Sequence, residues 1–281
     1  MFDFITAFLD PDNGFLRLAL YMGTLASLSF GVIGTYVITR RITFLAGSIS
    51  HCVFGGIGAG LYIQKKIGIA WFDPIYGAVG SALLAAGIIG FVTLYARQRE
   101  DTVIGALWAV GMAAGLIFID LTPGYFDLSS YLFGDILLIS SNDLWLVIGL
   151  DVIVLSLSAF FFNKFLAVCF DNEFASLRGI NVGFFYTLLL CLIALTVVLL
   201  VRIVGVVMVI ALLTLPAATA GHLTGRLIKM MLLAIIFCMA FIWSGLVFSY
   251  SLRLSSGPVI ILIAGFTYLA VLTGARILKK P

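Results

Sequence analysis

The sequence predicts an all-α protein, a polytopic transmembrane helix bundle of eight to nine spans. Three observations lead to this fold class: 63% of the 281 residues are hydrophobic, only 10% are charged, and the mean hydropathy is +1.21. An ordinary soluble domain carries about 25% charged residues. Because a soluble fold leaves much of its surface in water, no aqueous core hides this much apolar area. We expect one transmembrane domain over residues 1–281.

Nine apolar runs are candidates for the spans, since a helix needs about 20 apolar residues to cross the hydrocarbon core. The stretch 183–222 is nearly continuous, and we place the break between two spans at Arg202. The segment 131–142 is too short to span and predicts an interfacial or re-entrant helix packed against protein. In chain order the predicted spans are 15–38, 44–63, 74–96, 102–119, 143–162, 183–201, 203–222, 227–250 and 258–276.

The placement of Lys and Arg predicts an outer N-terminus and a cytoplasmic C-terminus, because basic residues gather in cytoplasmic loops. The inner side then holds eleven basic residues: Arg40, Arg41, Arg97, Arg99, Lys164, Arg178, Arg226, Lys229, Arg276, Lys279 and Lys280. The outer side holds five: Arg17, Lys65, Lys66, Arg202 and Arg253. The first residues, MFDFITAFLDPDNG, lack the basic start of a removable signal peptide, so the first span is expected to act as the insertion signal.

Several functional classes are disfavoured by the sequence. The net charge of +3 is too small to suggest a nucleic-acid partner. The four cysteines lack paired spacing and are expected to fill apolar positions. The chain has no phosphate-binding glycine loop with its lysine, no HExxH pair and no GxSxG elbow. We therefore expect no enzymatic activity, and an energy source in a separate ATP-hydrolysing chain or an ion gradient.

The 29 glycines indicate a tight bundle within the lipid. Gly56 with Gly60, and Gly111 with Gly115, have the small-xxx-small spacing that lets helix backbones approach closely. Proline inside a helix removes one backbone hydrogen bond and bends the chain. The residues assigned to helix packing are Gly47, Gly55, Gly56, Gly60 and Pro216, and Pro216 is expected to kink its helix.

His51 is the strongest functional candidate. It lies within the apolar run 44–63, close to Ser48 and Cys52, and it is one of only two histidines. An ionisable, metal-binding group inside hydrocarbon is costly and marks a functional site by default. Cys52 points about 100° away from His51 on a helix and is a poor co-ligand. Ser48 is better placed, either as a weak ligand or as a donor to a backbone carbonyl.

The segment 164–182 is the longest amphipathic break on the inner side. Asp171 can cap a short helix, Glu173 falls in its first turn, and Gly179 can end it. The stretch EFASLRG, from Glu173 through Ala175 and Arg178 to Gly179, follows the pattern E-x-A-x-x-x-G. This pattern resembles the loop through which bacterial ABC importer permeases dock on their ATP-binding subunits. A short interfacial helix joining two spans would give the same pattern.

Four stretches together resemble the zinc/manganese/iron ABC transporter permease family over about residues 15–276. They are RRITFLAGSISHCVFGGIGAG at 40–60, REDTVIGALWAVGMAAGL at 99–116, the loop at 173–179, and VGVVMVIALLTLPAATAGHLT at 204–224. The resemblance implies passage of a divalent zinc, manganese or iron ion through a bacterial cytoplasmic membrane, with no permanently bound cofactor. It also implies two cytoplasmic ATP-binding subunits, a second permease, identical or paralogous, and an extracytoplasmic metal-binding protein.

The family motif of the second span reads roughly F-L-G-D-x-x-S-H-A. Phe44, Leu45, Ser50 and His51 match it, whereas Ala46 replaces the glycine and Gly47 replaces the aspartate. Asp and His at i and i+4 share a helix face and suit zinc or manganese. With the carboxylate absent, His51 acts with ligands from elsewhere, or an unlike partner permease brings the aspartate, or His51 is a gate or a structural histidine.

Three further residues are candidates for the metal path. Glu100 and Asp101 begin the span at 102–119, either as a cation-accepting inner mouth or as acidic residues that favour the helix dipole. His222 follows TLPAATAG at 214–221 near the inner end of its span, as a second metal contact or as a solvated interfacial histidine.

Two other transport functions remain open from the sequence. A permease of the same architecture could carry a metal chelate, although that relative usually has a longer chain. A secondary transporter driven by protons or sodium would need buried acidic residues, and Asp151 is the only mid-span carboxylate. A purely structural role leaves His51 and the loop at Glu173 unexplained.

Overall fold

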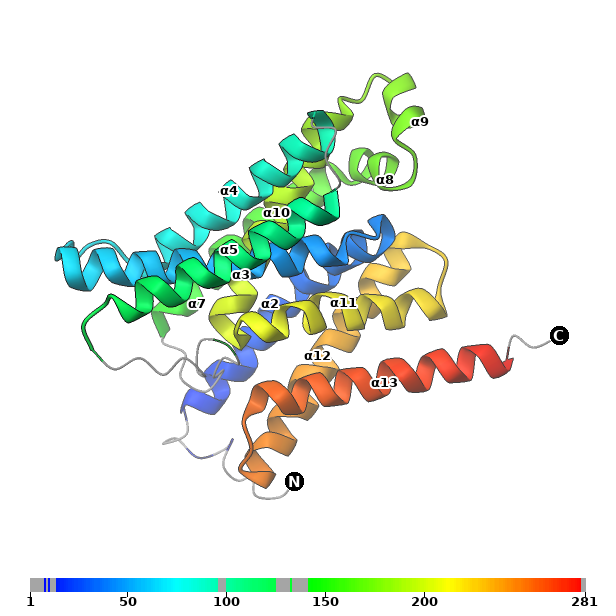
Figure 1. Ribbon diagram of the computed structural model, residues 1–281. Helices are drawn as coiled ribbons and strands as arrows, with labels where there is room; N and C mark the ends of the chain where they lie inside the picture. The colour runs from blue at the N-terminus through cyan, green and yellow to red at the C-terminus, as the bar shows by residue number, and fades with distance from the viewer. Residues whose placement is uncertain are drawn as a thin grey trace.

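The computed structural model describes residues 8, 10, 14–95, 100–124, 132 and 141–278 (Figure 1). Within these residues all regular structure is helical, which confirms the predicted fold class. Eight helices are long and apolar enough to cross a membrane, and a ninth span is formed if the bent pair at 144–170 counts as one. The helices are α2 (Gly14–Arg40), α3 (Thr43–Tyr62) with its continuation η2 (Ile63–Ile67), α4 (Pro74–Tyr95), α5 (Glu100–Asp120), α7 (Ser141–Phe160), α8 (Phe162–Phe170), α9 (Asn172–Leu177), α10 (Val182–Val204), α11 (Val206–Leu223), α12 (Leu227–Leu252) and α13 (Ser256–Leu278).

Two expectations about the middle of the chain have different outcomes. The break predicted at Arg202 is wrong, because α10 continues to Val204 and the chain breaks at Gly205, whose φ is +81°. A side chain is strained at that φ, so glycine allows the turn. Val204 and Val206 are buried, so the break lies inside the protein, where irregular backbone is tolerated at membrane depth. Most of the helix predicted over 131–142 lies outside the described residues.

Helices α3 and α10 form the centre of the bundle, and α5 and α13 lie at its edge. The most apolar stretch of α3 is 83% buried and that of α10 is 72% buried, against 17% for α5 and 11% for α13. The outward faces of α5 and α13 are apolar, so they fit lipid or another membrane subunit. The candidate histidine therefore sits on the best-buried helix.

Glycines bring α3 into close contact with both of its neighbours. A Cβ added at Gly56 would collide with the carbonyl of Gly77 in α4, and one at Gly60 would lie 2.7 Å from the Cα of Pro74. On the other face, a Cβ at Gly55 would lie 2.8 Å from the carbonyl oxygen of Gly111 in α5. Such approaches need the missing side chains. The register of α3 between α4 and α5 is consequently fixed.

The short helix α9 lies at one end of the bundle, together with the turn from α11 to α12 (Figure 1). The turn between α3 and α4 lies at the opposite end (Figure 1). Helix α8 bends away from α7 by 72° before the chain forms α9. This bend turns the chain across the end of the bundle, where Phe165 and Val168 of α8 remain buried.

Candidate functional site

His51 lies on α3 against the ring of Trp108 from α5. The two ring centroids are 4.4 Å apart and the planes are inclined by 26°, which is a stacked contact. The imidazole Nδ1 is buried and has no hydrogen-bond partner among the described residues. The side chain as a whole remains partly exposed. The contact with Trp108 is therefore what orients the ring.

The polar neighbours of His51 on α3 donate hydrogen bonds to backbone carbonyl groups. The Ser48 hydroxyl donates to the carbonyl of Ile104, at 3.0 Å, and the Ser50 hydroxyl donates to the carbonyl of Gly47, at 2.7 Å. The Cys52 thiol contacts the carbonyl of Leu107 at 3.4 Å. Ser48 thus follows the backbone-bonding alternative, because its single proton already satisfies a carbonyl of α5.

Gly47, the position of the family's aspartate, faces two side chains. A Cβ built there would lie 2.9 Å from Cδ1 of Ile210 in α11 and 3.1 Å from Cζ3 of Trp108. The side-chain space of position 47 is therefore already occupied. Within the described part of the chain, His, Cys, Asp and Glu nowhere gather in a group of three that could hold a metal ion.

The remaining candidates for the metal path are spread along the bundle. Asp101 is exposed in the first turn of α5, seven residues before Trp108, which is about 10 Å along the helix. The side chain of Glu100 lies outside the described residues. His222 is exposed, and its ring packs 5.8 Å from that of Tyr268. It does not join His51, because it lies twelve residues, about 18 Å along α11, beyond the contact of Ile210 with Gly47.

Pro216 lies within α11, which continues through it as one helix from Val206 to Leu223. The residue is buried in the packed part of the bundle. One turn earlier, the carbonyl of Leu213 lies so close to α2 that a Cβ at Gly34 would collide with it. The proline therefore sits beside one of the closest helix contacts.

The segment after α8 forms the predicted short helix. The Asp171 side chain accepts hydrogen bonds from the backbone N–H groups of Glu173 and Phe174, at 2.9 and 3.0 Å, which confirms it as the N-cap. Gly179 has a φ of +74° and follows the helix end, as expected for a C-terminal glycine. Ala175 is fully buried, and the Arg178 guanidinium lies 4.8 Å from the Phe174 ring centroid.

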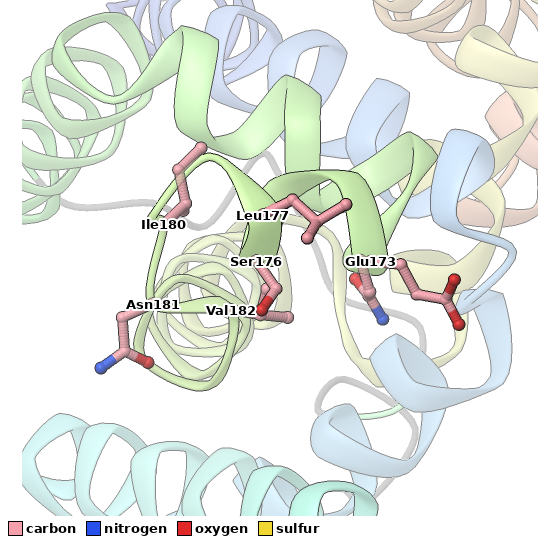
Figure 2. Close-up of a pocket in the computed structure, with 7 residues that line it drawn as sticks. Glu173, Ser176, Leu177, Ile180, Asn181 and Val182 are labelled. Atoms are coloured by element: carbon pink, nitrogen blue, oxygen red, sulfur yellow. The ribbon is translucent and has the colours of Figure 1, made fainter.

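A pocket of about 640 Å³ lies beside α9 (Figure 2). Glu173 and Leu177 project from the helix in Figure 2, and Leu177 is 87% exposed. Phe170 and Phe174 are also exposed large apolar side chains of this region. The residues that line the pocket are Asn172, Glu173, Ser176, Leu177, Ile180, Asn181 and Val182. A small helix with exposed apolar side chains beside a hollow is a suitable docking point for another protein.

Helices α8 and α9 are tied to the bundle by contacts that the sequence does not reveal. The Arg40 guanidinium, at the end of α2, donates to the carbonyl of Val168 at 2.9 Å and lies 5.4 Å from the Tyr186 ring centroid. Phe165 packs edge-on against Tyr36 of α2 and against Phe185 of α10. These contacts fix α8, and through it the start of α9, against the ends of α2 and α10.

Asp151, the mid-span carboxylate, lies in the interface between α7 and α2. Its Oδ1 accepts a hydrogen bond from the Ser29 hydroxyl. The residue is only 4% exposed, and its Oδ2 has no partner among the described residues. The carboxyl group therefore belongs to the contact between α7 and α2.

Comparison with known proteins agrees with this arrangement. A model of the ABC 3 transport family matches residues 12–275. The chain belongs to the ABC 3 transport family. Among members of the family, the manganese transport system membrane protein MntC of Listeria innocua is 37% identical over 251 residues, 89% of this chain and 87% of that protein. An uncharacterised membrane protein of Synechocystis sp. is 42% identical over 263 residues, 93% of this chain and 91% of that protein.

A solved structure shows the same fold as this ABC 3 transport protein. PsaBC from Streptococcus pneumoniae, determined in complex with a Fab, superposes with a TM-score of 0.84 at 30% identity. The match covers 96% of this chain and 94% of that chain. The resemblance to a metal ABC transporter permease family is confirmed.

Two residues of the site carry no motif signal. Trp108 lies in the small-residue stretch GALWAVG at 105–111, where a single large ring on a glycine-lined face is the only sign of a special contact. In the sequence, Arg40 indicates only the orientation of the chain in the membrane. Its hydrogen bond to the Val168 carbonyl depends on the bend before α8.

Proposed function

We propose that this chain is the permease subunit of an ATP-binding-cassette importer that moves a divalent transition metal ion, of the zinc, manganese or iron class, across the bacterial cytoplasmic membrane. The observation that carries the proposal is the nearly full-length match to a protein named as a manganese transport membrane protein, together with the fold of PsaBC. The chain forms the transmembrane path of the ion, and ATP is hydrolysed by a separate subunit. The metal is its cargo, and no resident cofactor is needed.

His51 contributes a neutral imidazole to the path of the ion. It projects from the most buried helix, and its Nδ1 has no hydrogen-bond partner among the described residues. Imidazole is a common ligand of zinc and of other transition metals. Asp101, with Glu100, lies toward the end of α5 that we assign to the cytoplasm, where a carboxylate can accept the released cation. His222 is an exposed contact of lower importance at the inner end of α11.

Helix α9 couples the permease to ATP hydrolysis. It presents Leu177 beyond the bundle, and its capping by Asp171 and Gly179 holds it as a rigid unit. One ATP-binding subunit docks here on each permease, so that an importer of two permeases, identical or paralogous, holds two ATPases. The contacts of Arg40 and Phe165 then transmit the closing of the ATPases to α2 and α10.

We assign the N-terminus to the outside and the C-terminus to the cytoplasm. The end of the molecule that carries α9 also carries Arg40, Arg41 and Arg226, in agreement with the bias of basic residues toward the cytoplasm. The opposite end, at the turn between α3 and α4, then faces the extracytoplasmic metal-binding protein. Lipid covers the apolar outer faces that no subunit occupies.

The proposal is tested by reconstituting the chain with its ATP-binding subunit, paired permease and metal-binding protein in vesicles. Uptake of radioactive zinc or manganese should require ATP on the side of α9 and should stop with an ATPase that binds but does not hydrolyse ATP. A protonophore should leave uptake unchanged. Uptake that follows a proton gradient without ATP would instead support a secondary transporter.

A further inference from the structure

We propose that Trp108 sets the metal selectivity of the path by filling the side-chain space of position 47, so that this subunit offers an imidazole without a carboxylate and favours zinc over manganese. This inference rests on the proposed function, because it assigns the class of ion that passes His51. It concerns a contact between α3 and α5 that the sequence motif does not include.

The first step of the argument is the space around Gly47. An added Cβ would approach Ile210 Cδ1 to 2.9 Å and Trp108 Cζ3 to 3.1 Å, closer than ordinary van der Waals contact. The Ile210 methyl is the end of a flexible side chain and can rotate away. Trp108 cannot move as cheaply, because the rest of its ring lies flat on the imidazole of His51. The indole is therefore the fixed obstacle.

The second step is the position of α5 itself. Two side chains of α3 donate hydrogen bonds to backbone carbonyl groups of α5. Ser48 bonds to Ile104, and Cys52, one turn farther along α3, bonds to Leu107. Farther along, a Cβ at Gly55 would meet the carbonyl of Gly111 at 2.8 Å. The α5 backbone is held against α3 both before and after Trp108. These contacts oppose a withdrawal of the helix that would make room for a longer side chain at position 47.

The third step is the chemistry that remains. Manganese prefers oxygen ligands such as carboxylates, whereas imidazole nitrogen suits zinc. Ser48, Ser50 and Cys52 keep their hydrogens and donate them to carbonyl groups, which leaves two weakly ligating hydroxyls and a neutral thiol, so His51 is the strongest metal ligand of this stretch.

The experiment compares zinc and manganese uptake by the reconstituted importer in four variants: Gly47→Asp, Trp108→Leu, the double variant Gly47→Asp/Trp108→Leu, and the matched double variant Gly47→Asn/Trp108→Leu. Asparagine has the size of aspartate without its charge. Trp243→Leu is the control for loss of an indole, since Trp243 is half exposed on α12 and bonds to Thr24. The readout is the ratio of manganese to zinc uptake, because zinc binds more tightly than manganese at nearly any site.

The aspartate should act only when the indole is absent. Gly47→Asp alone should impair uptake of both ions without raising the ratio. Gly47→Asp/Trp108→Leu should raise the manganese-to-zinc ratio by about tenfold over Trp108→Leu, in line with the effects of residues that support metal ligands. The ratio for Gly47→Asn/Trp108→Leu should stay near that of Trp108→Leu. The ratio for Trp243→Leu should stay near that of the wild type.

Two outcomes would overturn the inference. One is a ratio that rises as much in Gly47→Asp as in the double variant, which would show that Trp108 does not limit the space. The other is an equal rise with asparagine, which would remove the carboxylate as the cause. Loss of all ATP-dependent metal uptake by the wild-type importer would instead reject the proposed function.

A second measurement does not depend on transport by the variants. The full-length permease with Trp71, Trp145 and Trp243 replaced by Phe retains Trp108 as its single indole fluorophore. Nickel, a paramagnetic ion that imidazole binds, should quench this fluorescence when His51 is present and much less in the His51→Ala variant. Equal quenching in both would show that the indole does not report on metal at His51.

Discussion

At the scale of single residues, His51 is oriented by stacking on the ring of Trp108. Metal-binding histidines are usually oriented differently, by a hydrogen bond from the ring nitrogen that does not bind the metal. The sequence identifies His51 because an imidazole in an apolar run is rare and costly. It also shows that Gly47 departs from the family motif. It does not show which side chains face position 47, because Trp108 and Ile210 are 61 and 163 residues farther along the chain. Such contacts follow from helix register, which one sequence does not define.

Asp151 gives a prediction about stability at this scale. Asp151→Asn should keep the bond from Ser29, because the amide oxygen still accepts a proton. Ser29→Ala should lower the free energy of unfolding by roughly 1 kcal/mol, the usual size of such bonds between membrane helices. Thermal unfolding of the purified protein in detergent measures both. If Asp151→Asn is stable but abolishes uptake, the carboxylate has a transport role that we do not assign to it.

At the scale of helices, the spans could be predicted well and their junctions less well. Length and hydropathy are properties of a local stretch, so the runs for α2, α3 and α12 emerge directly from the sequence. The break at Gly205 lies in an unbroken apolar stretch, where only a backbone with positive φ shows the turn. Arg202, the single charge nearby, was therefore a misleading marker.

The packing of α3 on α4 predicts opposite effects for two glycines. Gly56→Ala should destabilise the protein by about 1–3 kcal/mol, because its methyl group collides with the carbonyl of Gly77. Gly80→Ala, also in this pair of helices, has open space around the new Cβ and should be neutral or slightly stabilising. Thermal unfolding of the two variants side by side gives the comparison. Equal effects would contradict the close approach of α3 and α4.

Helix α9 gives a prediction about assembly. Leu177→Ala removes an 87% exposed side chain, so it should leave the stability of the permease unchanged while weakening its association with the ATP-binding subunit. Co-purification of the two subunits measures this loss. Leu262→Ala, on the exposed face of α13, is the matched control and should not affect association. Normal co-purification of Leu177→Ala would place the docking surface elsewhere.

At the scale of the whole molecule, a buried bundle is joined to a small external helix by a few defined contacts. The sequence predicts the bundle and α9 separately, since hydropathy marks one and the capping residues Asp171 and Gly179 mark the other. The connection through Arg40, Val168 and Phe165 depends on the 72° bend before α8, which has no proline or glycine to signal it. Under the proposed function, this connection would carry motion of an ATPase to the spans.

The connection predicts an uncoupled variant. Arg40→Ala loses the bond to the Val168 carbonyl and the contact with Tyr186, so α8 is held less firmly to α2. ATP hydrolysis by the assembled importer should persist while metal uptake for each ATP hydrolysed falls several-fold. Arg226→Ala, an exposed basic residue at the start of α12 on the same end, should retain the wild-type ratio. An unchanged ratio in Arg40→Ala would exclude this route.

The passage of the ion past His51 is tested most directly by zinc uptake per ATP hydrolysed in the reconstituted His51→Ala importer. The variant should assemble with its ATP-binding subunit and hydrolyse ATP, because α9 is a separate short helix at one end of the bundle. Its zinc uptake should fall by about tenfold or more, as expected when a metal ligand is removed. Zinc uptake equal to that of the wild type would contradict a metal path along α3.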